Sequence, residues 1–119
     1  MTDMMNTDDS PTAAAPGLTV PLASVPEGSG LVVRVHPRLR VAIFRVGEAF
    51  YAIDDRCPHA GASLGEGALA GTVVTCPLHG FLVDVTTGRC PNHSLLRVRS
   101  FEVKREGDSL RVIVPVTSP

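Results

Sequence analysis

Tryptophan is absent from this chain of 119 residues, and aromatic residues make up only 4% of it. Since 44% of the residues are nevertheless hydrophobic, a core has to rest on Val, Leu, Ile and Ala. Residues of this kind favour sheets, and helical periodicity is weak along the whole chain. The chain is long enough for one modest hydrophobic core and too short for two stable domains. We therefore expect a single all-β domain.

Long apolar runs and a basic N-terminal region are also missing. No segment approaches the roughly 18 apolar residues of a membrane-spanning helix, and the start lacks the features of a signal peptide. Residues 1–17 carry three acids and no basic residue, and we predict a disordered leader there. Removing these three acids from the net charge of −1 leaves +2 for the remainder, which suggests neither nucleic acid nor membrane as a partner. We expect a soluble, cytoplasmic protein.

Cysteine occurs only three times, which argues against a disulfide framework. Two of the cysteines begin similar short segments, Cys-Pro-His at 57–59 and Cys-Pro-Leu-His at 76–79. In an extended loop the side chains at i and i+2 project to the same side, so Cys57 and His59 can reach neighbouring metal atoms. Cys76 and His79 complete a set of four ligands. The third cysteine, Cys90, is predicted to be a small, partly buried apolar residue without a function of its own.

This pattern resembles the Rieske [2Fe-2S] ferredoxin family, in which two cysteines hold one iron of the cluster and two histidines hold the other. The neighbouring residues match as well, because a proline follows each cysteine, a glycine stands at 61 and at 80, and Thr87-Gly88 lies downstream. Glycine lets the main chain come close to an inorganic core, and proline fixes φ. The resemblance is close over residues 54–91 and looser over residues 18–115.

The resemblance implies one [2Fe-2S] cluster per chain, bound by Cys57, His59, Cys76 and His79. It also implies a Rieske fold, in which an antiparallel β-sandwich or barrel-like base from both chain ends carries a small, loop-rich cluster-binding subdomain. The predicted organisation is a leader at 1–17, a Rieske domain at 18–115 with its cluster-binding part at about 54–92, and a tail at 116–119.

Strand-like patterns separated by turn residues support the all-β expectation. A single helical turn is possible at 60–64, and a tight turn is predicted at Glu106-Gly107-Asp108. Asp54 and Asp55, just before the first cysteine segment, are predicted to be exposed, and so are His36 and His93. The expected strands cover residues 19–23, 31–35, 41–46, 50–53, 73–75, 81–85, 97–105 and 109–114.

Relatives with a high redox potential typically have an extra cysteine in each ligand loop, together with a serine and a tyrosine that donate hydrogen bonds to the cluster. This chain has Ala60 and Leu78 where those cysteines would fall, Phe81 at the serine position and Val83 at the tyrosine position. Because hydrogen bonds to the cluster tune its potential, their loss predicts a low-potential centre.

Two other uses of cysteine and histidine have to be weighed. Structural zinc sites also take Cys2His2 sets, but their spacing usually pairs cysteine with cysteine and histidine with histidine, whereas this chain alternates them. A Cys–His nucleophilic pair needs a single activated thiol, which leaves the second matched segment without a purpose. The iron–sulfur interpretation accounts for both segments.

Three functions remain open for a domain of this kind. The first, which we favour, is a one-electron carrier between a flavin reductase and a terminal oxygenase of the ring-hydroxylating type. The second is the small subunit of an assimilatory nitrite reductase, partnered by the large subunit, and the third is a structural metal-binding module. Catalysis by the chain itself is not expected, because an oxygenase also needs a mononuclear iron site of two histidines and a carboxylate.

Overall fold

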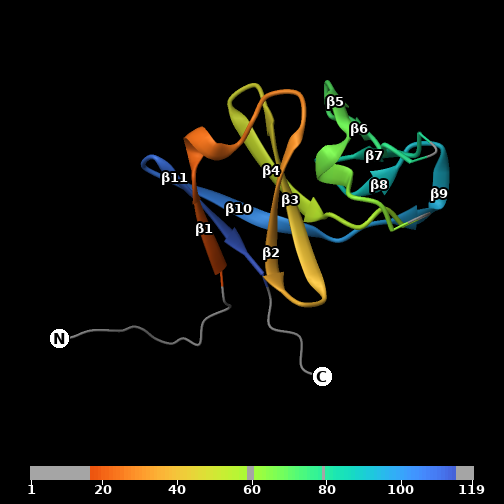
Figure 1. Ribbon diagram of the computed structural model, residues 1–119. Helices are drawn as coiled ribbons and strands as arrows, with labels where there is room; N and C mark the ends of the chain where they lie inside the picture. The colour runs from red at the N-terminus through yellow and green to blue at the C-terminus, as the bar shows by residue number, and fades with distance from the viewer. Residues whose placement is uncertain (1–16, 59–60, 79, 115–119) are drawn as a thin grey trace.

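The base of the molecule is one antiparallel sheet of six strands built from both ends of the chain (Figure 1). The structure, a computed structural model, describes residues 17–58, 61–78 and 80–114. The strand order is β1-β11-β10-β4-β3-β2, and a short 3-10 helix, η1 (Leu22–Ser24), follows the first strand. The strands are β1 (Gly17–Pro21), β2 (Gly30–His36), β3 (Leu39–Val46), β4 (Ala49–Asp54), β10 (Ser100–Glu106) and β11 (Ser109–Ile113).

A second, smaller part of the fold lies between β4 and β10 and stands to one side of the base sheet (Figure 1). It holds a three-stranded sheet of order β5-β6-β7 and a separate hairpin of β8 and β9. Its elements are η2 (Leu64–Glu66), β5 (Ala68–Ala70), β6 (Val73–Thr75), β7 (Leu82–Asp84), β8 (Arg89–Cys90) and β9 (His93–Arg97).

Strand β3 is buried on both faces and joins the two parts. Val41 and Ile43 point into the core of the base, with Leu110 and Val112 of β11. The alternate residues Ala42 and Phe44 belong to a second core, whose other members lie mostly in the smaller part. Successive side chains of a strand point to opposite faces, so an uninterrupted apolar run serves both cores at once. That second core includes Ile53, Cys57, Leu64, Val74, Cys76, Phe81, Val83, Val85, Cys90 and Val98.

The structure confirms the all-β expectation and the pairing of the chain ends. Strand β1 pairs with β11, and β10 turns into β11 through the predicted tight turn, where Gly107 adopts a positive φ of 63°. The strand β1 begins at Gly17, the last residue of the predicted leader, while residues 1–16 and 115–119 lie outside the described residues. Within the described ranges, neither helix is long and apolar enough to cross a bilayer.

Several details differ from the expectation. The strand predicted at 97–105 begins only at Ser100, as β10, because the N–H of Val98 donates to the carbonyl of Gly88 at 2.8 Å and not to a neighbouring strand of the base. The helical turn expected at 60–64 starts later, as η2 at Leu64. Strands β5, β8 and β9 were not predicted, since all three are short and their residues lack a clear alternating pattern.

Gly88 offers a test of this packing, with Gly107 as a matched control. Both have a positive φ, but a methyl group on Gly88 would lie 2.2 Å from the carbonyl oxygen of Val98, whereas one on Gly107 would meet nothing within 4 Å. We expect Gly107→Ala to cost about 1–2 kcal/mol of unfolding free energy from its left-handed backbone alone. Gly88→Ala should cost clearly more, because main chain has to move. Urea unfolding of both variants measures the difference, and equal losses would contradict this account.

Candidate metal centre

The first cysteine segment forms a closed loop directly after β4. The N–H of Cys57 donates to the carbonyl of Ala62 at 2.9 Å, and the N–H of Gly61 donates back to the carbonyl of Cys57 at 2.8 Å. Gly61 has a φ of 74°, in the left-handed region that favours glycine. The side chain of Cys57 is only 1% exposed. This loop therefore holds its cysteine in place through main-chain bonds on both sides.

The second cysteine segment repeats this construction after β6. The N–H of Cys76 donates to the carbonyl of Phe81 at 2.6 Å, five residues on, as Ala62 is five residues beyond Cys57. Gly80 stands four residues after its cysteine, as Gly61 does, and has a φ of 68°. The two loops are thus equivalent although their histidine spacing differs by one residue.

The two cysteine side chains lie side by side. Burial is the largest influence on the Cys76 thiol and raises its pKa, the backbone of Leu78 lowers it by hydrogen bonding, and the neighbouring Cys57 raises it again. A side-chain hydrogen bond between the two thiols makes Cys57 and Cys76 direct neighbours. Thiolate is the ligand that zinc and iron–sulfur centres share, so the donors present fit one iron of a Rieske cluster.

The two predicted histidine ligands, His59 and His79, lie outside the described residues, as does Ala60. Among the residues that the structure describes, no three His, Cys, Asp or Glu side chains gather as a metal-binding group. The described part of the centre consists of the two cysteines and the loops that carry them. The four-residue ligand set stays a prediction.

Asp84 and the Thr87-Gly88 pair, which follow the second loop, form a hydrogen-bonded turn. The Asp84 carboxylate accepts hydrogen bonds from the N–H and the hydroxyl of Thr86, at 2.9 and 2.7 Å. The N–H of Gly88 donates to the carbonyl of Asp84 at 2.7 Å, which closes the turn between β7 and β8. This part of the motif shapes a turn, in which Oδ1 of Asp84 accepts both hydrogen bonds from Thr86.

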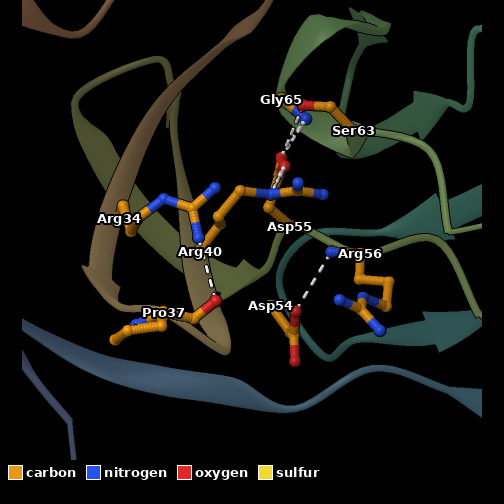
Figure 2. A network of polar contacts seen from close by, with 8 residues as sticks. All are labelled: Arg34, Pro37, Arg40, Asp54, Asp55, Arg56, Ser63 and Gly65. Carbon is orange, nitrogen blue, oxygen red and sulfur yellow. Dashed lines mark hydrogen bonds and ion pairs between the residues drawn. The ribbon is translucent and has the colours of Figure 1, made fainter.

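The prediction that Asp55 is exposed is wrong, because its side chain is 0% exposed. Figure 2 shows the polar residues that surround it. Its Oδ2 accepts a hydrogen bond from Nε of Arg40 at 3.1 Å. Its Oδ1 accepts from the hydroxyl of Ser63 at 3.0 Å and from the N–H of Gly65 at 2.7 Å. A buried carboxylate is stable only with such partners. The sequence does not reveal this buried carboxylate, because nothing in it distinguishes Asp55 from the adjacent Asp54.

The neighbouring Asp54 behaves differently. Its side chain is 25% exposed and lies 3.7 Å from the guanidinium of Arg99, while its Oδ1 accepts a hydrogen bond from the N–H of Arg56 at 3.0 Å (Figure 2). Asp54 is therefore half-buried, so the prediction of two exposed acids holds in part for Asp54 and is wrong for Asp55.

Phe81 and Val83, which stand where high-potential relatives have hydroxyl donors, are both buried. Phe81 is 7% exposed and Val83 is fully buried, so both positions supply apolar side chains without a hydroxyl donor. His93 is exposed, as predicted, but its ring also stacks on Phe81 with centroids 5.3 Å apart, which sequence reasoning did not find. Leu78, beside His79 in the chain, is 47% exposed.

Cys90 is buried in the same core as the two ligand-loop cysteines. Burial raises the pKa of the Cys90 thiol, and the nearby Cys57 raises it further. A thiol with a raised pKa is a weak nucleophile at neutral pH, in keeping with the predicted packing role.

Comparison with known proteins decides the family. The model of the Rieske [2Fe-2S] domain matches residues 18–102 of the sequence. The chain belongs to the Rieske [2Fe-2S] family. Its cofactor is accordingly a [2Fe-2S] cluster, and the paired cysteines in equivalent loops agree with that assignment.

Two groups of proteins are similar to this Rieske protein: ferredoxins of dioxygenase systems and small subunits of nitrite reductases. The 3-phenylpropionate/cinnamic acid dioxygenase ferredoxin subunit of Escherichia coli (strain K12) is 38% identical over 103 residues, which covers 83% of this chain and 93% of that protein. A chain in the complex of reduced oxygenase and oxidized ferredoxin in carbazole 1,9a-dioxygenase is 31% identical with a TM-score of 0.76, covering 87% of this chain and 97% of that one.

The second group is represented by a solved structure, that of an NADH-dependent nitrite reductase small subunit from Mycobacterium tuberculosis. Its TM-score is 0.77, and the match covers 86% of this chain and 97% of that one, but the sequences are only 18% identical. Identity this low shows a common fold and nothing further about function.

Proposed function

We propose that Cys57 and Cys76 bind one iron of the [2Fe-2S] cluster and that His59 and His79 bind the other. The observation that carries the proposal is the equivalence of the two loops, each of which presents a buried cysteine from a main-chain turn closed five residues on. A cluster bound between such loops would be covered by protein on the side of its two cysteine ligands. The cluster supplies one-electron transfer, and the chain's residues hold it and exclude water from its cysteine side.

We further propose that partners dock around His59 and His79. The loop around His79 supports this proposal, because Pro77, Leu78 and Gly80 are all exposed while Cys76 is buried. An exposed leucine beside a histidine ligand offers apolar contact where the electron would leave. Short distance between the cluster edge and the surface is what an electron carrier needs.

The proposed role is that of a one-electron carrier from a flavin reductase to a terminal oxygenase. It is supported by the ferredoxin subunit of the Escherichia coli dioxygenase, which is 38% identical and matches along 93% of its own length. The alternative role in a nitrite reductase rests on a likeness at 18% identity, which extends to the fold alone. The oxygenase system is therefore the better supported of the two.

Reconstitution tests this role directly. The purified protein, with its cluster, would be mixed with a flavin-dependent ferredoxin reductase, NADH and an aromatic-ring dioxygenase, both taken from a known oxygenase system. We expect the reductase to bleach the visible absorbance of the cluster and the dioxygenase to restore it. Co-purification with a large sirohaem enzyme, without reoxidation by a dioxygenase, would contradict the proposal in favour of nitrite reduction.

The ligand cysteines can be tested with Cys90 as a matched control. Cys57→Ser or Cys76→Ser should abolish cluster assembly, because an alkoxide is a poor substitute for thiolate on iron. Cys90→Ser makes the same chemical change in the same core and should leave two irons per chain. Iron and sulfide content, together with the rhombic resonance of the reduced cluster, report the result. Full iron loading in either ligand variant would refute the assignment.

The redox potential tests the consequence of the apolar Phe81 and Val83. We expect a midpoint near the lower end of the span of about −150 to +300 mV observed for histidine-ligated [2Fe-2S] clusters. Replacing Phe81 by serine should raise the midpoint, because a hydroxyl donor stabilises the reduced cluster. Redox titration of both proteins measures this, and a midpoint of the unaltered protein well above zero would show that other donors act on the cluster.

A further inference from the structure

Asp55 is a fully buried carboxylate two residues before Cys57, and the proposed ligand set does not use it. Its partners come from two separate parts of the fold. Arg40 belongs to β3 of the base sheet, whereas Ser63 and Gly65 lie at the start of η2 in the smaller part (Figure 2). The carboxylate is thus shared between the base and the segment that follows the first ligand loop.

The main chain of Asp55 makes the same connection. Its N–H donates to the carbonyl of Arg40 at 2.9 Å, and its carbonyl accepts from the N–H of Leu64 at 2.7 Å. Arg56 and Ser63 form a bridge between the two ends of the loop that contains Cys57. Both ends of this loop are therefore tied to one residue, and a shift of Asp55 has to move the loop.

The neighbourhood of Gly65 leaves little freedom for rearrangement. A methyl group added there would lie 2.3 Å from the side chain of Val32 and 3.0 Å from Oδ1 of Asp55. Such close packing keeps the N–H of Gly65 directed at the carboxylate. The contact cannot easily be replaced by a different arrangement of the same residues.

We propose that Asp55 is a positioning residue for the cluster, which holds the first ligand loop against the base sheet through its charge pair with Arg40. The proposal rests on the ligand assignment given above. It adds that the pair keeps a net charge of zero beside the cluster, so that its two members act on the redox potential in opposite directions.

The direction in which each variant shifts the midpoint follows from the sign of the remaining charge and does not depend on its exact distance from the cluster. In the unaltered protein the carboxylate and the guanidinium cancel, and Asp55→Asn leaves an uncompensated positive charge. Positive charge near a redox centre favours the reduced form and raises the midpoint, because an added electron is attracted to it. Arg40→Gln leaves an uncompensated negative charge and lowers the midpoint. The double variant removes both charges and restores the balance.

The experiment is redox titration of the cluster in the full-length protein and in these three variants, with iron release into a chelator followed alongside. We expect an upward shift for Asp55→Asn, a downward shift for Arg40→Gln, and a return towards the original midpoint in the double variant. In a fourth variant, Asp55→Ala, iron release should become several-fold faster, because the three hydrogen bonds that the Asp55 carboxylate accepts are lost.

Asp54→Asn is the matched control, since it removes the same charge one residue earlier from a side chain that is 25% exposed. It should shift the midpoint less than Asp55→Asn and leave iron release unchanged. Shifts of one sign in both single variants, or effects of Asp54→Asn equal to those of Asp55→Asn, would overturn the proposal. If Asp55→Asn does not fold, the double variant and Arg40→Gln decide: the proposal requires a midpoint near the original in the double variant and a lowered midpoint in Arg40→Gln, and any other result overturns it.

These outcomes are distinct from a failure of the proposed function. The unaltered protein is first shown to hold two irons with a reduced-state resonance of the Rieske type, which tests the ligand set by itself. The midpoint of the cluster does not depend on which reductase or oxygenase it serves. An error about the partners would therefore leave this test intact.

Discussion

The hydrogen-bonded ion pair of Asp55 and Arg40 is the interaction on which the placement of the metal centre depends. It joins Arg40 of β3 to Asp55, two residues before Cys57. Ser63 and Gly65 are the other hydrogen-bond donors to the carboxylate. Removing one partner of a buried pair typically costs about 3–5 kcal/mol, because the other charge is left uncompensated. Arg40 is partly exposed, so the cost here lies towards the lower end of such values. The strands supply the framework, and this pair orients the first ligand loop upon it.

The apolar packing acts together with that pair. Strand β3 gives Val41 and Ile43 to the core of the base and Ala42 and Phe44 to the core beneath the cysteines. The buried thiols of Cys57 and Cys76 are themselves members of that second core. Both cysteines would therefore bind a Rieske cluster from a tightly packed apolar environment. In the second loop, Pro77, Leu78 and Gly80 are exposed although Cys76 is buried.

The sequence was sufficient to predict the family and the all-β fold, because Cys-Pro-His and Cys-Pro-Leu-His are chemically specific patterns and the strand-like segments are rich in valine. It was not sufficient for Asp55, whose partners Arg40 and Gly65 lie 15 residues before it and 10 residues after it in the chain. Nothing in local composition distinguishes this acid from Asp54. The start of β10 at Ser100 was also missed, since the bond from Val98 to Gly88 is a tertiary contact. The histidine ligands remain a prediction from the motif.

The pairing of the first and last strands of the fold has a consequence for how such a domain is combined with others. Gly17 lies opposite Ile113 in the β1–β11 ladder, so the chain enters and leaves the base sheet at one place (Figure 1). A polypeptide that enters and exits side by side can be spliced into a larger protein without pulling the sheet apart. The same architecture is thus suited both to a free-standing carrier and to a cassette within a longer enzyme.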